Sequence, residues 1–179
     1  MSSRIHTPAI ESATGATAEV YAQIKKAAGK VPNTFAAIGA LDPAALEAIL
    51  QADAVLAKST LSGPDRETIK LIVSQAAGCD YCVAAHSLLG KLAGLKPEAL
   101  EQIRAGHPTG DAKRDALIHF VWSLAQTAGT IPGEEFADIK TAGYTNAELV
   151  AISLAFAVTV FTNVFNRIND TTVDFPRVA

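Results

Sequence analysis

Apolar side chains recur at helical spacing in almost every segment of this chain, and glycine or proline residues stand between the segments. Within residues 17–28, Val20, Tyr21 and Ile24 fall on one helical face, and Gly29 follows directly as a stop signal. We find neither the strict apolar–polar alternation of a half-buried strand nor a hairpin signal. The pattern therefore predicts an all-α fold, a compact helical domain of about seven to eight helices.

Three of the expected helices have well-marked boundaries. Asp42 is an N-cap residue with Pro43 at the first helical position of a segment that runs to residue 58. The next helix starts near Ser62 and ends at Gly78, and the last long helix starts at Thr145 and runs toward residue 170. The connections are short and no linker divides the chain, so we expect residues 1–179 to form a single domain.

The composition excludes one class of partner and favours a globular protein. The chain has 179 residues, of which 49% are hydrophobic and 18% are charged, so we expect a sizeable buried core and little disorder. The net charge is -3, and no block of basic residues is present. We therefore expect no nucleic-acid partner.

The distribution of apolar residues predicts a soluble protein of the cytoplasm. The first residues, MSSRIHTPAIES, contain no apolar core of a secretory signal. The longest apolar run, residues 149–161, is shorter than the roughly 18 residues that cross a membrane. We therefore expect no membrane partner and interpret this run as a buried core or subunit-interface helix. In the reducing cytoplasm, two neighbouring cysteines are more often catalytic, redox-sensing or metal-binding than structural.

Both cysteines of the chain lie in the segment GCDYCVAAHSLLG, residues 78–90. Cys79 and Cys82 are separated by two residues, a spacing shared by redox dithiols, zinc sites and haem-attachment sites. Haem attachment requires histidine directly after the second cysteine, where this chain has Val83. An iron–sulfur cluster normally requires four thiolates, and the chain has two cysteines.

A zinc-binding module remains an alternative. Cys79, Cys82 and His86 occupy positions i, i+3 and i+7, which fall on one helical face. A structural zinc site usually takes a second ligand pair from elsewhere, and the other histidines repeat no such spacing. We therefore favour a redox dithiol and expect neither a metal nor a cofactor.

The helix geometry gives the two sulfurs different expected roles. A helix N-terminus favours thiolate over thiol, and this effect alone would make Cys79 the attacking thiolate. His86 lies one turn from Cys82 on the same face, so it can accept the proton of Cys82 and pair with its thiolate. Because a nearby base outweighs a dipole effect of about 0.3–1 kcal/mol, we expect Cys82 to attack, with a depressed pKa, and Cys79 to resolve.

Glu67 is the leading candidate for orienting His86. It lies near the start of the preceding helix, and a folded-back arrangement of the two helices would bring it to the histidine. From the residues alone, the preferred interpretation is instead an acid in the first turn that interacts favourably with the helix dipole.

The spacing of Glu67, Cys79, Tyr81, Cys82 and His86 resembles the active-site signature of the alkylhydroperoxidase D-like (AhpD-like) family, within the carboxymuconolactone decarboxylase superfamily. The stretches VPNTFAAIGALDPAALEAIL and FNRINDTTVDFP are similar to the two ends of its peroxidase-related members. The decarboxylase branch lacks the cysteine pair, so the resemblance favours the redox branch.

The resemblance implies an all-helical domain that assembles into trimers or hexamers. It implies that Cys82 is peroxidatic, Cys79 is resolving, and His86 and Glu67 relay protons. Tyr81 occupies a position that is histidine in some members and tyrosine in others. Its phenol is a weak proton carrier near neutral pH, so we expect it to position water or substrate rather than to relay protons.

The implied activity is reduction of peroxides through the dithiol, with a lipoyl-protein or a thioredoxin-like protein as reductant. A general disulfide reductase or redox sensor uses the same thiols and remains an alternative. The polar residues near the end of the last helix have two open interpretations. They either bind a neighbouring subunit or close the cleft of the dithiol, or they cap the C-terminus of the helix in the ordinary way. These residues are Asn163, Asn166, Arg167 and Asp170.

Overall fold

The computed structural model describes residues 3–178, and within that range it contains nine α-helices, one short 3-10 helix and no strand. The all-α prediction is confirmed, with slightly more helices than expected, and three of them are only nine residues long. In chain order the α-helices are α1 (Gly15–Ala28), α2 (Asn33–Leu41), α3 (Pro43–Ala57), α4 (Gly63–Ala76), α5 (Asp80–Leu92), α6 (Pro97–Ala105), α7 (Ala112–Thr127), α8 (Gly133–Thr141) and α9 (Asn146–Asn169).

Side-chain caps fix the starts of the long helices at the predicted positions. Asp42 accepts a hydrogen bond from the backbone N–H of residue 45 at 3.0 Å, and Ser62 accepts one from residue 65 at 3.1 Å. Thr145 and Glu148 form a reciprocal capping box at the start of α9, with bonds of 3.1 and 2.7 Å. Each cap satisfies backbone donors that the first helical turn leaves unpaired.

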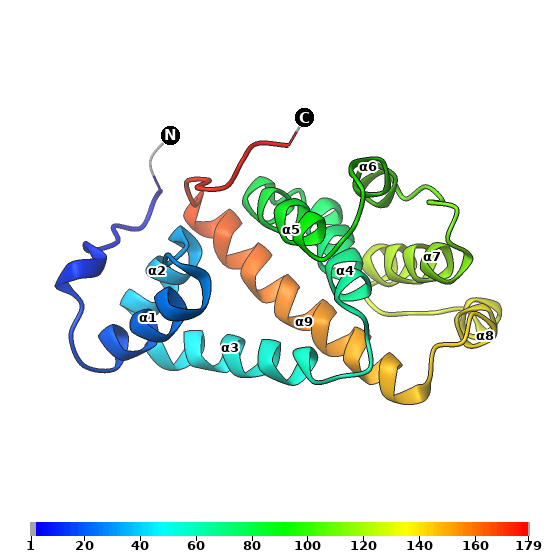
Figure 1. The fold of residues 1–179 in the computed structure, drawn as a ribbon, viewed down its shortest axis with the longest axis horizontal. Helices are drawn as coiled ribbons and strands as arrows, with labels where there is room; N and C mark the ends of the chain where they lie inside the picture. The colour runs from blue at the N-terminus through cyan, green and yellow to red at the C-terminus, as the bar shows by residue number, and fades with distance from the viewer. Residues whose placement is uncertain (1–2, 179) are drawn as a thin grey trace.

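Helix α9 runs diagonally through the middle of the molecule (Figure 1). The helices α1, α2 and α3 lie on one side of it, and α4 to α8 lie on the other. α9 contacts α3, α4 and α5, while α4 also packs against α5, α6 and α7. One apolar cluster is centred on α4, α7 and the first half of α9, and a smaller one on α1 to α3. The chain positions α9 so that its second half faces both α2 and α5.

Helix α9 has the length and composition of a membrane-crossing helix, although the apolar run in the sequence is shorter. Its place in the fold is central, and it carries the buried polar residues Glu148, Asn163, Asn166 and Asn169. All four side chains form hydrogen bonds within the protein, and the partner of Asn166 Nδ2 is the sulfur of Cys82. The helix is therefore a core helix, with one face left exposed.

The connection between α4 and α5 consists of residues 77–79 and turns the chain back on itself. Gly78 has a φ of 60°, in the left-handed region where glycine is favoured. The guanidinium of Arg167 donates to the backbone carbonyls of Ala77 and Gly78, and a Cβ atom at position 78 would lie 2.9 Å from its Nη1. Arg167 thus holds the turn that presents Cys79.

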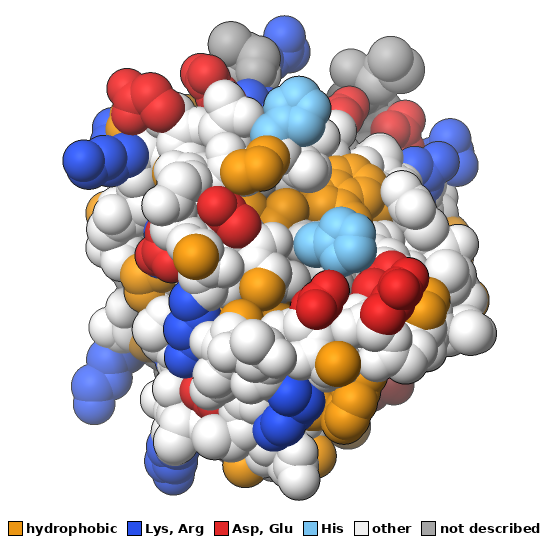
Figure 2. All heavy atoms as spheres, turned by 90° about the vertical axis from the view of Figure 1, so that its right-hand side faces the viewer, with side chains coloured by type: hydrophobic (Ala, Val, Ile, Leu, Met, Phe, Trp, Pro, Cys, Tyr) orange, Lys and Arg blue, Asp and Glu red, His pale blue; other side chains and the backbone are white. Residues whose placement is uncertain are grey.

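The end of the molecule formed by α6, α7 and α8 carries charges of both signs, interspersed over its surface (Figure 2). It contains a hollow of about 310 Å³ whose lining includes His119, Trp122 and Glu135. The indole N–H of Trp122 donates to the carbonyl of Ile103 at 3.3 Å, which ties α7 to α6. The cysteines do not line this hollow.

Candidate active site

The two cysteines lie at the start of α5 with their sulfur atoms in contact. Cys79 is the N-cap residue and Cys82 lies in the first turn, and each is only 3% exposed. Both are free thiols, and their sulfur atoms are hydrogen-bonded to each other at 2.7 Å. A disulfide between them requires an S–S distance near 2.05 Å, so a small movement of the first turn closes the bond.

The surroundings of the pair favour negative charge on Cys79. Its pKa is lowered mainly by the hydrogen bond with Cys82, against the effect of burial. The backbone N–H of Cys82 donates to Cys79 Sγ at 3.4 Å, and the positive charge of Arg167 acts in the same direction, while Asp80 opposes it.

The expectation that Cys82 has the depressed pKa is wrong for this arrangement. The hydrogen bond with Cys79, burial and the charge of the Cys79 thiolate raise the pKa of Cys82. Asn166 and Thr162 act in the opposite direction, and Asn166 Nδ2 donates to Cys82 Sγ at 3.2 Å. Within residues 3–178 the partner of the His86 ring is a carboxylate at Nδ1, and the predicted pairing of His86 with Cys82 is not present.

That partner is Glu67, as the folded-back arrangement of α4 and α5 predicted. His86 Nδ1 and Glu67 Oε2 lie 2.9 Å apart, and the two side chains are 14% and 15% exposed. Burial raises the pKa of Glu67, but the hydrogen bond from His86 and the positive charges of His86, Lys70 and Arg66 outweigh it and lower the pKa. The bond occupies Nδ1, and Nε2 has no hydrogen-bond partner among residues 3–178.

Tyr81 is fixed by the C-terminal segment rather than directed at the sulfurs. Its hydroxyl donates to Asp174 Oδ1 at 2.7 Å and accepts from the backbone N–H of Thr34 at 3.2 Å. Burial is the main cause that raises the pKa of Tyr81. The ring of Phe175 packs edge-on against Tyr81, and Lys30 pairs with Asp174 at 2.8 Å. Tyr81 therefore stays protonated and anchors residues 174 and 175 beside the dithiol.

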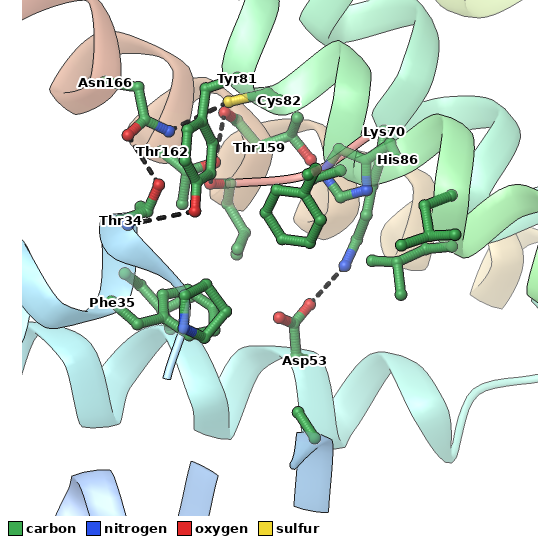
Figure 3. Close-up of a pocket in the computed structure, with 18 of the residues that line it drawn as sticks. Thr34, Phe35, Asp53, Lys70, Tyr81, Cys82, His86, Thr159, Thr162 and Asn166 are labelled. Atoms are coloured by element: carbon green, nitrogen blue, oxygen red, sulfur yellow. Dashed lines mark hydrogen bonds and ion pairs between the residues drawn. The ribbon is translucent and has the colours of Figure 1, made fainter. Parts of the chain in front are cut away.

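A cavity of about 610 Å³ opens beside Cys82 and His86 (Figure 3). Its walls come from α1, α2, α3, α4, α5, α9 and the C-terminal segment and are largely apolar. Of the two cysteines, only Cys82 lines it. Figure 3 shows Cys82, Asn166, Tyr81 and Thr34 grouped together, with the side chains of Lys70 and Asp53 in another part of the cavity.

The structure adds residues to the site that the sequence left open or did not indicate. Asn166 bonds Cys82, and its Oδ1 accepts from the hydroxyl of Thr34 at 2.7 Å. The buried Asn163, one turn away, bonds Ser74 and the carbonyl of residue 73 instead. The polar sector of the last helix was the available signal for Asn166, whereas nothing in the sequence indicated Thr34, Asp53 or Lys70 as neighbours of the cavity.

The zinc alternative finds no third ligand in the part of the chain that the structure describes. Across residues 3–178, no three side chains of the types His, Cys, Asp or Glu are grouped so that they could hold a metal ion. His86 faces Glu67 rather than sharing a ligand geometry with the two sulfurs.

Comparison with known families and structures agrees with the geometry. Residues 43–120 match the model of the carboxymuconolactone decarboxylase family, a range that contains Glu67, both cysteines and His86. Comparison of the sequence with curated proteins finds no match.

Several solved structures share the fold. An AhpD-core peroxidase-related protein from Ralstonia eutropha JMP134 has a TM-score of 0.83 at 21% identity, with 96% of this chain and 92% of that chain covered. A peroxidase-related protein from Silicibacter sp. TM1040 has a TM-score of 0.79 at 19% identity, with 95% and 91% covered. The debrominase Bmp8, solved in complex with 2,3,4-tribromopyrrole, has a TM-score of 0.81 at 18% identity, with 96% and 94% covered.

Proposed function

We propose that this chain is an AhpD-like member of the carboxymuconolactone decarboxylase superfamily and that it is a thiol-dependent peroxidase. The observation that carries the proposal is the position of Cys82, which is the one sulfur of the dithiol that lines the large cavity. A peroxide bound in the cavity meets Cys82 first, with Cys79 directly behind it at 2.7 Å.

The reaction begins when the proton shared by the two sulfurs moves to Cys79. Cys82 then carries the negative charge, which Asn166 Nδ2 stabilises. The thiolate attacks the terminal oxygen of the peroxide, the O–O bond breaks, and Cys82 becomes a sulfenic acid while an alkoxide leaves. Cys79 attacks the sulfenic sulfur, the S–S bond forms, and water leaves. The peroxide gains two electrons and the dithiol loses two.

His86 supplies the proton that the departing alkoxide requires. It lines the same cavity as Cys82, its Nδ1 is bonded to Glu67, and its Nε2 has no partner among residues 3–178. The Glu67 carboxylate fixes the orientation of the ring. Glu67 therefore acts through His86, and Tyr81 acts by holding the C-terminal segment beside the sulfurs.

An external dithiol restores the reduced state. A lipoyl-protein has a slender arm that suits a buried disulfide, and a thioredoxin-like protein is the other candidate. A general disulfide reductase is less well supported, because both sulfurs are 3% exposed and a folded protein disulfide is bulky. The fold shared with the debrominase Bmp8 makes a brominated pyrrole a further substrate to test against the peroxides.

Peroxide consumption with dihydrolipoamide as reductant tests the proposal. We expect Cys82→Ser to abolish turnover and Glu67→Gln to lower kcat/KM by about 10- to 100-fold, as for a disturbed general acid. If Cys82→Ser keeps wild-type turnover, Cys82 is not the attacking group. If the wild type reduces a protein disulfide rapidly and peroxides slowly, the reductase alternative replaces the peroxidase.

We further propose that the protein is cytoplasmic and forms a homo-oligomer.

A further inference from the structure

We propose that the ion pair between Lys70 and Asp53 is a subsite for an uncharged polar group at the far end of the substrate. The preferred peroxide is then an apolar body that carries the hydroperoxide at one end and a hydroxyl or carboxamide group at the other. This inference rests on the proposed function of the same cavity and names the substrate class more narrowly.

The pair stands in apolar surroundings where packing does not require it. Lys70 Nζ of α4 and Asp53 Oδ1 of α3 lie 2.6 Å apart, with side chains 12% and 35% exposed. Both residues line the cavity, and their neighbours in the lining include Ile49, Leu88 and Leu89. A partly buried ion pair contributes little to stability compared with apolar residues of the same volume, because desolvation of the charges offsets their attraction.

The pair has hydrogen-bonding capacity that the protein does not use. An ammonium group has three N–H donors, and Lys70 forms one hydrogen bond in the described structure, to Asp53 Oδ1. Asp53 Oδ2 accepts no hydrogen bond from residues 3–178. Two donors and a carboxylate oxygen thus remain available to a molecule in the cavity. A group that both accepts and donates, such as a hydroxyl or a carboxamide, satisfies both members of the pair at once.

The charges around the cavity argue against an anionic substrate. Two lysines line it, and each already has a carboxylate partner: Lys70 with Asp53, and Lys30 with Asp174. The ring of His86, which also lines the cavity, is bonded to Glu67. A substrate carboxylate would find no unpaired cation and would meet the free oxygen of Asp53. An alkyl end without a polar group would leave the donors of Lys70 buried without a partner, which costs free energy.

The two polar parts of the cavity lie apart in Figure 3, and the lining of the cavity as a whole is largely apolar. Cys82, Asn166 and Thr34 form the reacting part, and Lys70 and Asp53 form the other. A bifunctional molecule with an apolar middle matches this distribution of polar and apolar lining, as ligand pockets generally combine an apolar wall with a few placed polar groups.

Three straight-chain alkyl hydroperoxides of matched length, ending in methyl, hydroxyl or carboxylate, test the inference in a peroxidase assay at several chain lengths. We expect kcat/KM for the hydroxyl-ended peroxide to exceed that of the methyl-ended one by about tenfold at the fitting length, the effect of one hydrogen bond to a charged group. The carboxylate-ended peroxide should be the poorest. Lys70→Met/Asp53→Leu should bring the ratio of kcat/KM for the hydroxyl-ended and methyl-ended peroxides to about one, whatever its effect on overall turnover. The control Lys91→Met, at an exposed position of α5, should leave that ratio at the wild-type value.

Equal kcat/KM for the three peroxides, a preference for the carboxylate, or a hydroxyl preference that survives in the double variant would overturn the inference. Should the double variant fail to fold, Asp53→Asn retains the volume and must still weaken the hydroxyl preference. Calorimetric binding of matched diols and simple alcohols to Cys82→Ser separates this inference from the proposed function. Diol binding that depends on Lys70 and Asp53, without any peroxide turnover by the wild type, would retain the subsite and reject the peroxidase.

Discussion

At the scale of residues, the reactivity of Cys82 depends on which sulfur holds the negative charge. At rest, the backbone N–H of Cys82 and the charge of Arg167 favour the negative charge on Cys79. Cys82 faces the cavity and accepts a hydrogen bond from the side-chain amide of Asn166. Because the two sulfur atoms are 2.7 Å apart, a single proton can be shared between them. The resting charge is therefore favoured on Cys79, and the proposed mechanism requires its transfer to Cys82.

Replacement of Asn166 tests the hydrogen bond to the attacking sulfur. We expect Asn166→Ala to lower the rate constant for oxidation of the dithiol by peroxide by about 10- to 100-fold, because a hydrogen bond to a charged group is lost. Asn163→Ala is the matched control: it also removes a buried amide of α9, but its partners are Ser74 and a backbone carbonyl. It should reduce stability and leave the rate unchanged. Equal rate losses in the two variants would mean that Asn166 only supports the fold.

The pH dependence of thiolate formation tests the charge distribution. Because the pKa of Cys79 is lowered and that of Cys82 raised, the wild type should form one thiolate below the ordinary thiol value of about 8.5 and the second well above it. Cys82→Ala removes the thiol partner and should raise the pKa of Cys79. Absorbance at the thiolate wavelength measures both. A first wild-type transition at or above the ordinary value would contradict this charge distribution.

At the scale of elements, the C-terminal segment after α9 covers the dithiol. Phe175 packs with Cys79, Tyr81 and Cys82, and its ring lies under the ammonium of Lys30 at 4.8 Å. Asp174 connects this segment to Tyr81 of α5 and to Lys30, which follows α1. Asp174 and Phe175 thus hold the segment over the sulfurs, and local opening at these two residues is a route by which a reductant could reach them.

Loosening of this segment should expose the thiols. We expect Asp174→Ala to increase the rate of thiol modification by an aromatic disulfide reagent about tenfold, because Tyr81 and Lys30 lose the shared carboxylate. Arg177→Ala, at an exposed position of the same segment, is the control and should leave the rate unchanged. An unchanged rate in Asp174→Ala would show that the segment does not limit access.

At the scale of the whole molecule, α9 leaves one apolar face uncovered. Val150, Phe161, Val164 and Ile168 recur on one side of the helix and are 71%, 45%, 51% and 59% exposed. A continuous exposed apolar face on the central helix is typical of an interface between protein chains. We therefore expect self-association through this face, in the trimer or hexamer that the family resemblance implies.

A charge placed on this face should dissociate the oligomer. We expect the wild type to elute as a trimer or hexamer and Val164→Lys to shift toward the monomer, because an unpaired charge at an apolar interface is costly. Val55→Lys provides the control, since Val55 is 59% exposed on α3, away from this face. Light scattering coupled to size-exclusion chromatography measures the mass. A monomeric wild type would reject the prediction.

Much of the fold could be predicted because its signals are local. Asp42, Ser62 and Thr145 cap the helices that they were expected to cap, and Gly29 ends α1 with a φ of 79°. Whether residues 1–179 unfold as a single domain stays a prediction.

The site could be predicted only where its residues share one helix or one hairpin of helices. Cys79, Cys82 and His86 belong to the start of α5, and Glu67 follows from the folding back of α4. Asn166 is 84 residues from Cys82, and Thr34 is 132 residues from Asn166, so their contacts depend on how α9 packs against α2 and α5. The charge of the sulfur pair was predicted wrongly because the contact of the two buried sulfurs, which raises the pKa of Cys82, cannot be read from the residue spacing.

The central claim is that Cys82 attacks the peroxide and Cys79 resolves the product. Its most direct test is to oxidise reduced single-cysteine variants with one equivalent of peroxide, trap sulfenic acid with dimedone and locate the adduct by peptide mass spectrometry. Cys79→Ser should yield a stable adduct on Cys82, whereas Cys82→Ser should consume peroxide no faster than an ordinary thiol. An adduct on Cys79 that forms in Cys82→Ser at the wild-type rate would contradict the account.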